Sequence, residues 1–237
     1  GILTEQMTSR DVLILVSDHG FRQRPFEVIN LNEFLRKKML LTIKSEYNRP
    51  SVRITQGLKK KTVSMLSHLG LLDFIASHLK KVGSVSKLKK SDHLIDKENS
   101  VCYTDPLFSG KKPYVGLNYG EKIRLADGTI RKQAFEKIKS VITSGEIPVP
   151  VWVKEAGDIY KGEFQARLPD ICIELPYKYG IEFNYFTDLI EKSSTHYKIS
   201  GGHFGSGTFG FYSPSMHCEN PPTSIIDFSE FIKRIAV

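Results

Sequence analysis

The spacing of the apolar residues changes along this chain, and that change most constrains its fold. Before about residue 100 the apolar residues recur at helical spacing, as in segments 31–47 and 60–83. From about residue 113 they form short runs separated by glycine and proline, which is typical of strands. Segment 224–235 returns to helical spacing, with Ser224 as its expected N-cap. This order predicts an α+β protein: a helical N-terminal part, a β-rich mixed or antiparallel sheet core and a C-terminal helix.

The same change suggests a division of the chain near residue 100. We expect residues 1–100 to form a mainly helical part that grips DNA and dimerises, and residues 101–237 to form a β-rich catalytic part. A chain of 237 residues can hold these as two domains or as one continuous domain. Within the second part, Asp127 and Gly128 predict a hairpin turn, and segment 158–168 reads as a strand.

Composition excludes several classes of protein. No apolar run reaches the about 18 residues that a membrane helix needs, so we expect no membrane partner. The three cysteines are isolated and lack the spacing of a zinc site or a disulfide framework. A reducing, cytoplasmic location is the expectation.

The formal net charge of +8 fits a polyanionic partner, and a solvated basic surface is the alternative explanation. Clustering of the lysines favours nucleic acid, because charges on one face can neutralise successive phosphates. The candidate phosphate contacts are Lys59, Lys60, Lys61, Lys80, Lys81, Lys89 and Lys90.

Segment 167–186, RLPDICIELPYKYGIEFNYF, reads as a strand, a tight turn and a second strand. Alternation puts Asp170 on one face of the first strand and Glu182 on one face of the second. In a hairpin the two carboxylates can converge, and they repel unless a cation lies between them. Mg²⁺ or Mn²⁺ takes such oxygen ligands and can activate water for attack on phosphate. The hairpin therefore predicts a metal site formed by Asp170 and Glu182.

The arrangement Pro169-Asp170 followed by Glu182-Phe183-Asn184 resembles the PD-(D/E)xK motif of the restriction-endonuclease-like nucleases. The resemblance covers about 25 residues and implies a metal-dependent nuclease site on the hairpin. Relatives often carry a further acid upstream, for which Glu163 is the first choice and Glu146 the second.

The chain departs from this motif at Asn184, where the nucleases have a lysine that orients or activates the attacking water. Lys178, Lys192 or Lys198 can supply the missing cation from nearby in the sequence. Alternatively, the site is inactive and the two acids are structural.

Histidines offer a second chemistry that needs no metal. His203 and His217 lie among glycines and aromatic residues in segment 196–220. A neutral histidine can act as general acid or base, and the aromatic rings can stack on bases. This pattern is compatible with a metal-independent nuclease or with a restriction glycosylase that excises a flipped base. Hydrogen-bonded or surface histidines are the simpler interpretation.

From these observations we expect a restriction-type DNA endonuclease that hydrolyses phosphodiester bonds. Its partner is double-stranded DNA, and palindromic targets favour a homodimer because protein and site then share a two-fold axis. The alternatives are the histidine-dependent enzyme and a DNA-binding module with a degenerate nuclease site.

Overall fold

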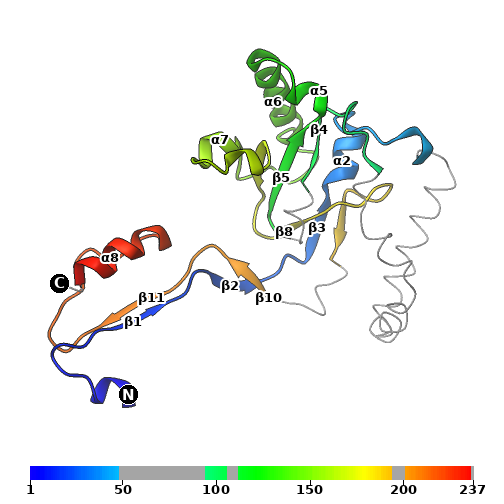
Figure 1. Ribbon diagram of the computed structural model, residues 1–237. Coiled ribbons are helices and arrows are strands. Elements are labelled where there is room, and N and C mark those ends of the chain that lie inside the picture. Colours follow the sequence, from blue (N-terminus) through cyan, green and yellow to red (C-terminus); the bar gives the residue numbers. More distant parts are fainter. Residues whose placement is uncertain (48–93, 106–111, 194–200, 236–237) are drawn as a thin grey trace, which may run out of the picture. The chain divides into compact units, whose positions relative to one another are not determined.

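The computed structural model describes residues 1–47, 94–105, 112–193 and 201–235. Helices and strands of several sheets, ending in a C-terminal helix, confirm the α+β class (Figure 1). Backbone contacts group the chain into two compact units, one formed by residues 1–23 with 201–237 and the other by residues 24–200. The unit boundaries thus lie at residues 23 and 200 rather than near residue 100.

A four-stranded antiparallel sheet forms the centre of the unit of residues 24–200. Its strand order is β4 (Cys102–Thr104), β5 (Tyr114–Tyr119), β7 (Ile171–Glu174) and β6 (Trp152–Glu155). Because side chains alternate along a strand, one face of the sheet carries most of the core residues of β5, β6 and β7. These are Val115, Leu117, Tyr119, Val153, Ile171 and Ile173, each exposed by less than a tenth.

Two helices follow β5, α5 (Glu121–Arg124) and α6 (Gly128–Ile142). The hairpin expected at Asp127 and Gly128 is wrong, because Asp127 instead caps α6. Its Oδ1 accepts hydrogen bonds from the backbone N–H groups of Thr129 at 2.8 Å and Ile130 at 3.0 Å. Aspartate suits an N-cap as well as a turn, and the buried Ala134, Phe135, Ile138 and Ile142 have helical spacing.

A second, mixed sheet has the order β8 (Tyr179–Glu182), β3 (Glu27–Asn30) and β9 (Ile190–Lys192). β3 pairs in parallel with β8 and antiparallel with β9. It leads directly into α2 (Leu31–Lys37), as Figure 1 shows. The expected helix over 31–47 stops here, because Met39 adopts a left-handed φ of 58°. Leu40 and Leu41 then enter the core, and a short 3₁₀ turn follows at Ser45–Tyr47.

The hairpin expected over residues 167–186 is also wrong. β7 pairs with β5 on one side and β6 on the other, whereas β8 pairs with β3 in the other sheet. All of Ile171, Cys172 and Ile173 are buried, so both faces of β7 are covered. The segment before β7 contains α7 (Ala156–Ile159) and a 3₁₀ turn at Gln165–Arg167, so the strand expected over 158–168 is wrong.

In the other unit, residues 1–23, which were expected to be mainly helical, instead supply one strand to each of two antiparallel strand pairs. β1 (Leu13–Val16) pairs with β11 (Phe209–Tyr212), and β2 (Gly20–Gln23) pairs with β10 (Gly201–Phe204). Between the pairs, residues 17–19 oppose residues 205–208, which is a bulge. A Cβ on Gly207 would lie 2.3 Å from the backbone oxygen of Ser17, so glycine is required there.

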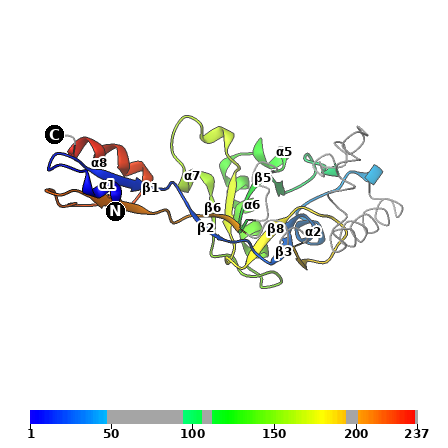
Figure 2. The same cartoon turned by 90° about the horizontal axis from the view of Figure 1, so that it is seen from below.

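Helices α1 (Ile2–Glu5) and α8 (Phe228–Ile235) complete this unit. A 3₁₀ turn at Ile225–Asp227 precedes α8, and the Ser224 side chain accepts from the Ile226 N–H, which confirms the expected cap. Phe231 of α8 is 1% exposed and packs edge-on against Phe209 and Phe211. Figure 2 shows α8 running alongside the β1–β11 pair. Throughout the described ranges, helices fall short of the length and apolar character that crossing a membrane requires.

Candidate functional site

Asp170, the first acid of the expected nuclease motif, lies directly before β7 and forms an ion pair with an arginine of the same unit. Its Oδ2 accepts from the backbone N–H of Tyr119 at 2.7 Å and from the guanidinium of Arg124 at 2.8 Å. β5 supplies Tyr119, and α5 supplies Arg124. The side chains of Asp170 and Arg124 are 27% and 48% exposed, so the pair lies at the protein surface.

Arg124 extends this contact into a hydrogen-bonded chain. It donates to Oδ1 of Asn118 at 3.2 Å, and Nδ2 of Asn118 donates to Oδ2 of Asp105 at 2.9 Å. The hydrogen bond to Asp170 raises the pKa of Arg124, with a smaller contribution from Asp105. We call Asp105, Asn118, Arg124 and Asp170 the Asp170 cluster. Its acids already face a permanent cation, which weakens the electrostatic reason for a metal there.

Tyr119 extends the polar region to β6. Its hydroxyl donates to Oε1 of Glu155 at 3.0 Å. Burial, and next the charge of Glu155, raise the pKa of Tyr119 far above its ordinary value. A phenol held in this state donates a hydrogen bond and does not act as a base near neutral pH.

Glu182, the expected partner of Asp170, belongs to the mixed sheet. It ends β8 and is in register with Asn30 of β3. Because β7 and β8 do not pair, the adjacent-strand geometry that suggested a shared metal is absent. Asn184 is also engaged elsewhere: its Nδ2 donates to Oδ1 of the fully buried Asn30 at 3.1 Å.

The structure gives no support to the expected Mg²⁺ or Mn²⁺ site. In the part of the chain that the structure describes, no three histidine, cysteine, aspartate or glutamate side chains are grouped so as to hold a metal ion. The acid expected upstream, Glu163, is exposed in the segment after α7. The second choice, Glu146, forms an ion pair with Lys38.

The lysines proposed to replace the motif lysine lie beside aromatic rings. Nζ of Lys178 is 4.8 Å from the ring centroid of Tyr179, and a hydrogen bond to that tyrosine raises the pKa of Lys178. Nζ of Lys192 is 5.8 Å from the ring centroid of Phe26. Lys198 and the seven candidate phosphate contacts lie outside the described residues: Lys59, Lys60, Lys61, Lys80, Lys81, Lys89 and Lys90.

A buried acid that the sequence did not single out lies on α2. Glu33 is 2% exposed and forms two hydrogen bonds with Arg36, at 2.8 and 2.7 Å. It also accepts from the backbone N–H of Phe186 at 2.9 Å, where the chain has a left-handed φ of 56°. Glu33 therefore fixes the segment after β8 to α2, which is a structural role.

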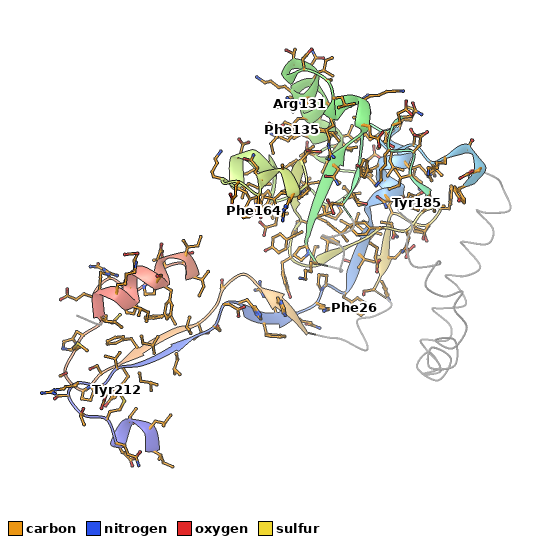
Figure 3. All side chains as sticks on the ribbon, viewed as in Figure 1. Phe26, Arg131, Phe135, Phe164, Tyr185 and Tyr212 are labelled. Atoms are coloured by element: carbon orange, nitrogen blue, oxygen red, sulfur yellow. The ribbon has the colours of Figure 1, made fainter. Side chains whose placement is uncertain are left out.

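The alternative catalytic histidines occupy different places in their unit. His203 lies on β10 directly opposite Phe21 of β2, and its ring stacks on that of His19 with centroids 4.0 Å apart. His217 lies in the exposed segment between β11 and α8, beyond Tyr212, which Figure 3 labels. The structure thus brings His203 to His19 and Phe21. In the sequence, His19 and Phe21 are two residues apart, but nothing there indicates that β10 lies beside β2.

Comparison of the chain with known protein families, with curated proteins and with solved structures finds no match.

Proposed function

We propose that this protein binds nucleic acid through the lysine-rich segment of residues 48–93. The observation that carries the proposal is the distribution of charge along the chain. This segment holds 10 of the 34 basic and 2 of the 26 acidic residues, which makes its formal charge +8. The remaining 24 basic and 24 acidic residues cancel.

A polyanion is the partner that this distribution favours. A surface made basic for solubility alone has no reason to confine the whole excess charge to 46 consecutive residues, whereas phosphate contacts do. Nucleic acid offers closely spaced phosphates, and each lysine that neutralises one releases a counterion. The expected contacts fix the position of the protein on the strand without reading its sequence.

Cleavage of the bound nucleic acid stays a prediction. Double-stranded DNA and a homodimer are the partners that the endonuclease hypothesis requires, and its Mg²⁺ site needs ligands other than a β7–β8 hairpin. Incubation of plasmid with the protein and Mg²⁺ or Mn²⁺, with and without EDTA, tests it directly. EDTA-resistant cleavage that depends on His203 points instead to histidine chemistry.

Fluorescence anisotropy with labelled duplex and single-stranded DNA tests the binding proposal. We expect the logarithm of the affinity to fall linearly with the logarithm of salt concentration. Replacing the three lysines at 59–61 by glutamine lowers that slope on duplex DNA by up to about 0.9 for each lost contact.

A control variant with the same loss of charge makes the result specific. Lys112, Lys132 and Lys137 are exposed and lie in the unit of residues 24–200. Their triple replacement by glutamine is expected to leave the slope almost unchanged. Equal effects of the two triple variants, or no binding by the wild type at low salt, refute the proposal.

A further inference from the structure

An exposed group of aromatic rings lies on the β2–β10 pair and has no part in the proposed binding through residues 48–93. Phe21 of β2 and His203 of β10 are directly opposite in register, so their side chains share one face of the pair. His19 joins them two residues before Phe21. We call Phe21, His19 and His203 the ring platform.

The geometry within the ring platform is that of closely packed aromatic side chains. The imidazoles of His19 and His203 are nearly parallel, with an interplanar angle of 16°. Phe21 stands edge-on to His203, with centroids 5.5 Å apart, and lies 5.7 Å from His19. Nδ1 of His19 is 3.1 Å from the backbone oxygen of Gly20, to which it can donate, and this contact fixes the ring orientation.

Although it packs against both histidines, Phe21 is 74% exposed. The next residue on its face of β10 is Gly201, which has no side chain to cover the ring. Leaving most of a phenylalanine ring in water gives up favourable burial, which is recovered when a flat apolar ligand covers it. Two stacked imidazoles beside the ring extend the aromatic surface available to such a ligand.

We propose that the ring platform stacks unpaired nucleobases of a single-stranded nucleic acid. Duplex bases hide their faces in the helix, whereas unpaired bases can stack on phenylalanine and histidine. Charge also favours this ligand, since the chain carries +8 in residues 48–93. This step rests on the proposed function, for which it specifies the ligand: single strands, held by the faces of their bases.

The decisive variant is Phe21→Ala, because Phe21 is mostly exposed and its loss leaves the buried residues intact. The probe is a labelled oligothymidine of about ten nucleotides, within the usual site size of single-strand binding proteins. We expect its affinity to fall by about 5- to 150-fold, the range for loss of one base–aromatic stack, with no change in salt slope. The affinity of Phe21→Ala for a duplex of equal length is expected to fall by less than about twofold. The control Phe164→Ala removes a phenylalanine that is 58% exposed elsewhere in the protein, and its affinity for oligothymidine is also expected to fall by less than about twofold.

A reporter variant separates this proposal from the proposed function. Phe21→Trp retains a stacking ring and adds indole fluorescence at the platform, and uncharged adenosine can quench it without any phosphate contact. Wild-type protein, whose one tryptophan is Trp152, gives the background. Saturable quenching by adenosine supports the platform even if the lysine variants show no binding defect.

Three outcomes overturn the platform. Oligothymidine affinity within twofold of wild type in Phe21→Ala, while the 59–61 variant binds weakly, refutes stacking and leaves the proposed function standing. Absence of adenosine quenching in Phe21→Trp refutes it independently. Self-association of the wild type that Phe21→Ala abolishes in sedimentation velocity, with oligothymidine binding intact, assigns the rings to contact between copies of the chain.

Discussion

Replacement of Asp170 by alanine distinguishes a structural role of this acid from a metal-binding one. In the structure its carboxylate holds the N–H of Tyr119 and the guanidinium of Arg124. Both contacts join parts of the fold that are remote in sequence, since Arg124 and Asp170 lie 46 residues apart. We therefore expect Asp170→Ala to destabilise the protein rather than to impair metal binding.

The magnitude follows from the two contacts. A charge-assisted hydrogen bond such as that from the Tyr119 N–H contributes about 1.5–3 kcal/mol. The ion pair with Arg124 contributes less, about 0.2–1 kcal/mol, because its side chains are 27% and 48% exposed and solvent screens the charges. Together they predict a loss of about 2–4 kcal/mol in the free energy of unfolding.

Urea unfolding of the wild type, Asp170→Ala and the control Asp158→Ala measures this loss, each with and without Mg²⁺. Asp158 is an exposed acid on α7, and its removal is expected to change stability by less than about 0.5 kcal/mol. Any stabilisation by Mg²⁺ is expected to be equal in the three proteins, because a ligand stabilises only through residues that bind it. Wild-type-like stability of Asp170→Ala, together with loss of a Mg²⁺ effect that the wild type shows, refutes the structural role.

Three further variants test other contacts, each by urea unfolding. Glu33→Ala is expected to cost about 3–5 kcal/mol, because it leaves a partly buried guanidinium without its carboxylate. Tyr119→Phe is expected to cost about 1–3 kcal/mol at neutral pH, since Glu155 loses its donor. The pKa of Tyr119 is raised on folding, so its contribution is complete below the ordinary value of about 10 and declines above it. As pH is raised above that value, the free energy of unfolding should therefore fall less in Tyr119→Phe than in the wild type. Asn184→Lys is expected to cost about 1–2 kcal/mol, because Asn30 loses its hydrogen bond, and to add no cleavage activity.

The sequence predicted the class of many elements but not their partners. Apolar runs in 167–186 correctly indicated two strands, yet periodicity says only that a strand is buried, not which strand lies beside it. Proximity in the chain suggested a hairpin, and the structure instead divides the two strands between two sheets. The Asp127-Gly128 signal failed for a related reason, since the same residues suit a turn and a helix N-terminus.

The surroundings of the expected site residues were less predictable than the residues themselves. Asp170 was correctly singled out as an acid at the start of a buried strand, but nothing local marks Arg124 as its partner. Only the antiparallel register of β5 with β7 brings the Tyr119 N–H to that carboxylate. The pair of Phe21 and His203 was unpredictable for the same reason, since it depends on the register of β2 with β10.

Binding and cleavage, the two parts of the endonuclease hypothesis, depend on different residues and so can be judged separately. The proposed phosphate binding depends on the charge of residues 48–93, which composition fixes whatever their fold. Cleavage through Asp170 and Glu182 depended on strand pairing, which the structure does not provide. Electrostatic contacts alone favour the duplex, whose charge density is higher, whereas a ring platform favours unpaired bases. The ratio of single-strand to duplex affinity at one salt concentration therefore reports which contribution dominates. If Phe21 acts as proposed, that ratio falls in Phe21→Ala and rises in the 59–61 variant, because each change removes only one of the two contributions.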